Sequence, residues 1–151
     1  MDFKTSLEVL QGIITELTEG ALVHKMQGQI FKSQGFEKLG QKYIDHFGEE
    51  MGWVEKCADR MLDLGHQPQM QGAKERDLIE DAEAYIKADL SIQRSGVETL
   101  YKILPALSCD PTTYDIVKAY LQDEDEDLYW SENQLELIER IGLQNWLIRQ
   151  M

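Results

Sequence analysis

Residues 42–64 of this chain are KYIDHFGEEMGWVEKCADRMLDL. The stretch contains no proline, and its apolar side chains recur every three or four residues, as on one face of an α-helix. These apolar positions are Tyr43, Phe47, Met51, Val54, Ala58, Met61 and Leu62. Gly65 and then Pro68 follow, which is a typical end of a helix. The stretch therefore predicts one helix of about 34 Å.

Three more long stretches and one short stretch show the same helical period. They cover residues 3–33, 81–107, about 112–140 and about 143–149. Asp110 followed by Pro111 is typical of a helix start, and Gly142 is expected to end the helix that follows. Pro105 is expected to kink or fray the last turn of the stretch that contains it. The chain is therefore predicted to be all-α.

Residues 65–80 contain Gly, Pro and Gln and show no clear period, so they predict a long connection. A long crossover is typical of a four-helix bundle in which the second and third helices run parallel. A length of 151 residues indicates a single domain, residues 1–151. The predicted architecture is a ferritin-like four-helix bundle with a long crossover between helices 2 and 3 and a short fifth helix at the C-terminus.

The composition is strongly acidic, with 28 acidic and 15 basic residues and a formal net charge of −13. This charge argues against nucleic acid or an anionic membrane as partner, and suits a protein that handles cations. No membrane-spanning apolar run and no signal peptide are expected. Cys57 and Cys109 form no CxxC pair, so reduced thiols and a cytoplasmic location are expected.

Three blocks of the sequence resemble bacterioferritins. The first is Glu49-Glu50-Met51 with Ala58-Asp59-Arg60, and the second is Lys87-Ala-Asp-Leu90. The third and most specific is residues 123–147, DEDEDLYWSENQLELIERIGLQNWL. The resemblance covers essentially the whole chain and is loosest in residues 1–35.

The resemblance implies a subunit of a 24-mer cage, built from two-fold dimers, that stores ferric mineral. It also implies a haem b at each dimer interface, held by one methionine from each subunit. Met51 matches that methionine, and a thioether is a suitable axial ligand for haem iron. Without the resemblance, Met51 would be interpreted as an ordinary core methionine. Lys25 and Gly48 are expected near this haem position.

The resemblance further implies a di-iron ferroxidase centre, whose ligands are four acids and two histidines from four helices. Carboxylates neutralise the two iron ions, and histidine supplies a neutral nitrogen. Glu50 and Glu124 match two of the acids. Trp53 stands at the position of one expected histidine, and Asp127 stands at the position of the other. Gln93 stands at the position of a third acid.

The first-helix ligand position matches Leu17 without a gap, and a shift by one residue would bring Glu16 there instead. The candidate metal residues are therefore Glu16, Glu50, Glu124 and Asp127. Because loss even of groups that support the ligands lowers metal affinity about 10–100-fold, we expect weak or absent ferroxidase activity. Without a metal, these acids form a buried polar network that needs hydrogen bonds or protons, with Gln93 as a possible partner.

The three histidines carry weaker signals. His46 lies one turn before Glu50 on the same helix face, a spacing that can bind one metal ion but is common without one. His24 is expected to be a hydrogen-bonded interior or interface residue rather than a metal ligand, and His66 to be solvated in a loop.

The preferred interpretation is a bacterioferritin-like cage subunit for iron storage, with haem at the dimer interface and impaired ferroxidase activity. It would form a homo-oligomer or a mixed cage with a catalytically intact subunit. One alternative is a metal-binding oxidase with a rearranged di-iron site that adds His46 to the four acids. Another is a structural or stress protein that keeps the fold and has lost both metal and haem.

Overall fold

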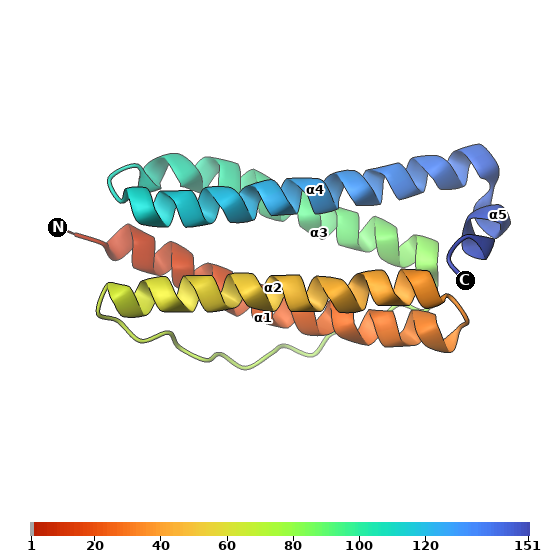
Figure 1. Ribbon diagram of the computed structural model, residues 1–151, viewed down its shortest axis with the longest axis horizontal. Helices are drawn as coiled ribbons and strands as arrows, with labels where there is room; N and C mark the ends of the chain where they lie inside the picture. Colours follow the sequence, from red (N-terminus) through yellow and green to blue (C-terminus); the bar gives the residue numbers. More distant parts are fainter. Residues whose placement is uncertain (1) are drawn as a thin grey trace.

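The computed structural model describes residues 2–151 and is a helical bundle (Figure 1). Its elements are α1 (Lys4–Ser33), α2 (Glu37–Asp63), α3 (Ala82–Ile103), the 3₁₀ turn η1 (Leu104–Leu107), α4 (Pro111–Ile141) and α5 (Leu143–Ile148). The predicted all-α class, with four long helices and a short fifth, is confirmed. α2 begins at Glu37, ahead of the predicted start. No helix within residues 2–151 combines the length and apolar character that crossing a bilayer requires.

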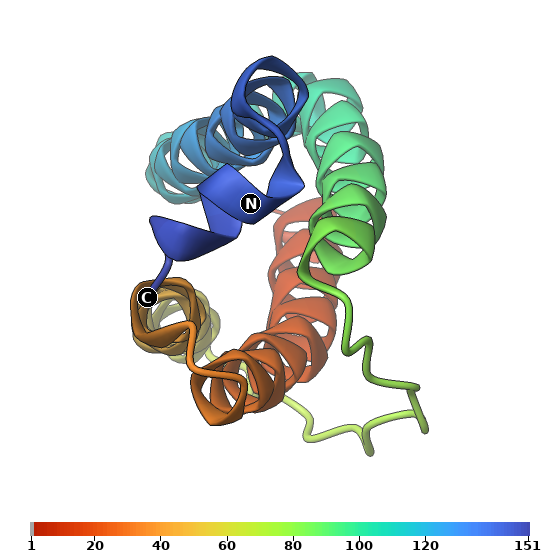
Figure 2. The same cartoon turned by 90° about the vertical axis from the view of Figure 1, so that its right-hand side faces the viewer.

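The long helices run in two opposite directions (Figure 1). α1 and α4 point one way, and α2 and α3 point the other way, so the expected parallel arrangement of α2 and α3 is confirmed. The connection between α2 and α3 returns along the outside of the bundle. α5 lies across the end of the bundle at which α1 and α4 finish (Figure 2).

Helix ends follow the predicted signals. Gly65 and Gly142 have φ values of 82° and 84°, a left-handed conformation that favours glycine. The Asp110 carboxylate accepts a hydrogen bond from the backbone N–H of Thr113, as an N-cap does. α3 gives way to the 3₁₀ turn at Pro105, which lacks the N–H that a continued α-helix needs.

The crossover is held against α1 by glutamine side chains. Gln11 accepts a hydrogen bond from the backbone N–H of Gln69 at 2.8 Å and donates one to its carbonyl at 3.0 Å. Farther along α1, the buried Gln27 amide pairs with the backbone N–H and C=O of Ile79 at 2.7 and 2.8 Å. These pairings satisfy backbone groups that a segment without secondary structure leaves free.

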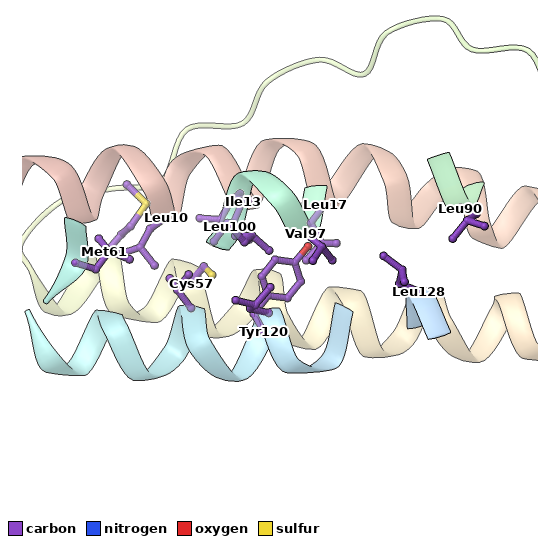
Figure 3. Close-up of a cluster of buried hydrophobic side chains, with 14 residues drawn as sticks. Leu10, Ile13, Leu17, Cys57, Met61, Leu90, Val97, Leu100, Tyr120 and Leu128 are labelled. Carbon is purple, nitrogen blue, oxygen red and sulfur yellow. The ribbon is translucent and has the colours of Figure 1, made fainter. Parts of the chain in front are cut away.

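Two apolar clusters fill the bundle. The larger one gathers side chains from all four long helices, including Leu10, Ile13, Leu17, Cys57, Met61, Val97, Leu100 and Tyr120 (Figure 3). The smaller one lies near α5 and is built around Phe31, Tyr43, Tyr85, Ile86, Ile138 and Trp146. Along each long helix, buried polar residues lie between the members of the two clusters. This polar layer is the feature of the fold that bears on function.

Close packing of α1 on α2 depends on Gly28. A Cβ atom there would lie 2.7 Å from the Gly40 carbonyl oxygen and 2.8 Å from Ile44 Cγ1. We therefore expect Gly28→Ala to lower the free energy of unfolding by about 1–3 kcal/mol, the usual cost of overpacking. Gly12 is the matched control, because a Cβ there meets nothing within 4 Å. Gly12→Ala should raise stability by up to about 1 kcal/mol in the same urea unfolding measurement; equal effects of the two changes would contradict this packing.

Candidate metal centre in the bundle

Five buried side chains from the four long helices form the centre of the polar layer. They are His24 of α1, His46 and Glu50 of α2, Asp89 of α3 and Asp127 of α4. Each is at most 8% exposed. We call these five residues the central polar group. Burial of this many polar groups is costly unless each finds a partner.

His24 connects two carboxylates. Its Nδ1 contacts the Glu50 carboxylate, and its Nε2 lies 3.0 Å from Asp89 Oδ1. Burial by itself would lower the pKa of His24. The charges and hydrogen bonds of Asp89 and Glu50 outweigh burial and raise this pKa well above its ordinary value. The prediction that His24 is a hydrogen-bonded interior residue is confirmed.

His46 makes the second link. Its Nε2 lies 2.9 Å from Asp127 Oδ2, and its Nδ1 lies 3.4 Å from the carboxylate of Glu49. The ring centroids of His24 and His46 are 5.1 Å apart. Burial lowers the pKa of His46, but the hydrogen bond and charge of Asp127 raise it above its ordinary value. The two imidazoles therefore lie side by side, each against acids.

Several polar atoms beside the group have no hydrogen-bond partner within residues 2–151. They are the Tyr43 hydroxyl, Gln93 Oε1 and Ser131 Oγ, all on buried side chains. The Gln93 amide donates to Asp89 Oδ2 at 3.3 Å, so the expected role of Gln93 as a hydrogen-bond partner is met through its nitrogen. Tyr43 of α2, Gln93 of α3 and Ser131 of α4 also line a small pocket between these three helices.

Glu124 lies near the group. Burial, with the charges of Asp127 and Glu50 adding to it, raises the pKa of Glu124 to about 8. The structure brings Glu50 and Asp127 together in the central polar group and places Glu124 within their electrostatic influence.

Glu16 does not join them. It is exposed on α1, whereas Leu17 is buried in the larger apolar cluster, so the alternative with Glu16 turned inward is corrected. The reason is the phase of α1, whose buried positions Ile13, Leu17, Ala21 and His24 follow one helix face.

Trp53 is half-buried and packs on Tyr120 with ring centroids 5.8 Å apart. Its indole Nε1–H donates to the carboxylate of Asp123 at 2.9 Å, and Asp123 is itself partly buried.

Glu50 and Asp127 occupy two of the positions that the di-iron centre would use, whereas the other three members of the central polar group are offset from such positions. His24 follows Leu17 by seven residues, His46 precedes Glu50 by four and Asp89 precedes Gln93 by four. Because α1 runs opposite to α2 and α3, all three offsets lead toward the same end of the bundle. Asp89 was not predicted as a site residue. Its signal is an acid one turn before Gln93, between the apolar positions Ile86 and Leu90.

Comparison with known proteins agrees with this fold. The family model described as a ferritin-like domain matches residues 7–141. The bacterial ferritin of Neisseria meningitidis serogroup B is 31% identical over 145 residues, covering 91% of this chain and 94% of that protein. The bacterial ferritin of Pseudomonas aeruginosa is 32% identical over 157 residues, covering 95% and 97%. The bacterioferritin of Mycolicibacterium paratuberculosis is 26% identical over 142 residues, covering 91% and 85%. This chain therefore belongs to the ferritin family.

Proposed function

We propose that this chain is a subunit of an iron-storage ferritin in which the di-iron position no longer oxidises iron efficiently. Leu17, Trp53 and Gln93 stand at three of the six ligand positions that the family resemblance implies. An alkyl side chain offers no ligand atom, an indole N–H only donates, and an amide adds no negative charge. The residues present do not fit a pair of iron ions.

This proposal rests above all on the packing and the hydrogen bond of the Trp53 side chain. Its ring is packed against Tyr120, and its only polar atom is already bonded to Asp123. Rotating this large side chain away to admit an ion would leave a gap in a close-packed region. Iron that reaches the bundle as substrate would meet Glu50 and Glu124 without the imidazole ligands that the family centre uses.

The acidic composition of the chain bears on iron storage, because a protein cage that stores iron must attract iron ions. The net charge of −13 favours accumulation of cations. We infer an assembly of two-fold dimers into a cage, either of this chain alone or mixed with a subunit that has an intact oxidation centre. Exposed apolar side chains such as Leu22 and Met26 on α1 are available for contacts between subunits.

Stopped-flow measurement of Fe(II) oxidation tests the proposal. Wild type and Glu50→Ala should show the same slow rate, because Glu50 no longer belongs to a working di-iron centre. A wild-type rate well above that of Glu50→Ala would support the metal oxidase with a rearranged site and refute the proposal.

We also propose that Met51 ligates haem at the dimer interface. Met51 is half-buried on α2, and a Cβ added at Gly48 or Gly52 beside it would meet nothing within 4 Å. These residues fit a flat macrocycle, because they leave open surface next to a thioether. The Lys25 ammonium lies 4.7 Å from the Phe47 ring centroid, one turn before Met51, where it could pair with a propionate. Haem held there would supply electron transfer.

Haem reconstitution followed by absorption spectroscopy tests Met51. Wild type should show a Soret band, and Met51→Leu should lose it because the axial sulfur is gone while the side-chain volume is nearly kept. Met70→Leu is the control, since Met70 is a highly exposed methionine in the crossover, away from α2. A wild-type protein without a Soret band, or an unchanged spectrum in Met51→Leu, would refute the role of Met51.

A further inference from the structure

We propose that the central polar group binds one divalent transition-metal ion through His24, His46 and Glu50. This site is distinct from the di-iron position, although Glu50 belongs to both. The proposal goes beyond iron storage, because it concerns a single resident ion and assigns it no oxidation step.

The ligand geometry supports a single ion. One ligand atom from each of His24, His46 and Glu50 can be chosen so that all three lie within 4.8 Å of one another. Two imidazoles and one carboxylate suit Fe(II) or Zn(II), whereas Mg²⁺ and Ca²⁺ prefer oxygen ligands. Three protein ligands also leave a coordination position for water.

Carboxylates behind the imidazoles hold them in place. For His24, Nδ1 faces Glu50 and would bind the ion, while Nε2 lies 3.0 Å from Asp89 and would donate its proton there. For His46, Asp127 and Glu49 contact the two nitrogens, so one carboxylate can orient the ring while the other nitrogen binds. Carboxylate–histidine pairs of this kind fix the tautomer and direction of a metal ligand.

Buried polar atoms without a partner lie beside the proposed site and are a second, independent observation. The Tyr43 hydroxyl, Gln93 Oε1 and Ser131 Oγ have no partner within residues 2–151, and each side chain is at least nine-tenths buried. They line one small pocket together with His46 and Asp127, so the pocket borders the proposed site on the side of His46 and is not lined by His24 or Glu50. Because a buried polar atom without a partner costs about 1–3 kcal/mol, a water held in this pocket next to the ion would stabilise these atoms.

Two other arrangements are possible and are separated by experiment. Protonated imidazoles could neutralise the acids without any metal. Alternatively, an ion could bind at the neighbouring group of His46, Glu49 and Asp127, whose ligand atoms also lie within 4.8 Å of one another. That group contains one imidazole and the largely exposed Glu49, whereas the proposed site contains two buried imidazoles.

Metal binding to the purified wild-type protein is the first test. Metal-free protein titrated with Co²⁺ should develop visible d–d absorption that saturates at one ion per chain. The X-ray absorption spectrum of the Zn²⁺-loaded protein should show two imidazole ligands. Absence of a saturable site, or a spectrum with one imidazole or none, would overturn the proposal.

Variants give the second test. His24→Gln should weaken Co²⁺ binding by more than about 100-fold, and Asp89→Asn, which acts through His24, by about 10–100-fold. His66→Gln is the matched control, because His66 lies exposed in the crossover, and this variant should bind Co²⁺ as tightly as wild type does.

Unchanged Co²⁺ affinity in folded His24→Gln would refute the site. If that variant does not fold, the wild-type zinc spectrum decides. Fe(II) oxidation is not measured here, so this proposal and the proposed function can fail separately.

Discussion

Replacing Leu17, Trp53 and Gln93 by Glu, His and Glu is expected to raise the rate of Fe(II) oxidation by at least about 100-fold. The three changes return two anionic ligands and one imidazole to positions next to Glu50 and Glu124. Asp127 remains a carboxylate, so the restored centre would have five acids and one histidine. The measurement is stopped-flow oxidation at equal protein and iron concentrations.

The control for this variant changes packing without adding strong ligands. Leu17→Gln combined with Trp53→Phe alters the same two positions and supplies neither an anion nor an imidazole. This control should keep the slow wild-type rate. If the restored variant and the control were folded and equally slow, the lost ligands would not be what limits oxidation, and the proposed function would lose its physical basis.

Asp110→Ala is expected to lower the free energy of unfolding by about 3 kcal/mol. The Asp110 carboxylate, which is 6% exposed, caps α4 and accepts hydrogen bonds from Ser6 of α1 at 2.8 Å and from Thr113. Arg60 of α2 reaches the same carboxylate at 2.7 Å. The change removes the cap and leaves the arginine without its partner where three helices meet. Urea unfolding measures the loss, and Asp59→Ala, at an exposed position next to Arg60, should change stability by less than about 0.5 kcal/mol.

The same carboxylate predicts a pH dependence. Burial would raise the pKa of Asp110, but hydrogen bonds from Thr113, Ser6 and Arg60 outweigh burial and hold the pKa below its ordinary value. A pKa that is lower in the folded state contributes stability above the unfolded pKa, and this contribution disappears as pH falls through the folded pKa. The difference between wild type and Asp110→Ala should therefore be constant down to about pH 4 and shrink below it. A difference that grew on acidification would contradict this assignment.

The helices could be predicted because their signals are local. Asp110 and Pro111 start α4 by their own chemistry, and Gly142 ends it with a positive φ. The apolar period needs no knowledge of the partner helix, since it only requires that one face be buried. The parallel course of α2 and α3 could also be predicted. A long crossover, such as the connection at 65–80, is typical of four-helix bundles in which the second and third helices run parallel.

The composition of the polar layer could not be predicted in the same way. Its contacts join residues that are far apart in the chain, as His24 meets Glu50 and Asp89. The family resemblance directed attention to the positions of Trp53 and Gln93, whereas the buried histidines lie one or two turns away. Helix periodicity shows that His24 faces inward, but only packing of α1 against α2 and α3 determines which carboxylates it meets.

The most direct test of a dismantled di-iron position is an anomalous difference map, recorded at the iron absorption edge, from crystals loaded with Fe(II). The expected map shows no pair of ions between Glu50, Trp53 and Glu124. Any iron inside the bundle should lie beside His24 and His46. Two iron ions bridged by Glu50 and Glu124 would contradict the claim that the ferritin fold has been kept while its oxidation centre has been lost.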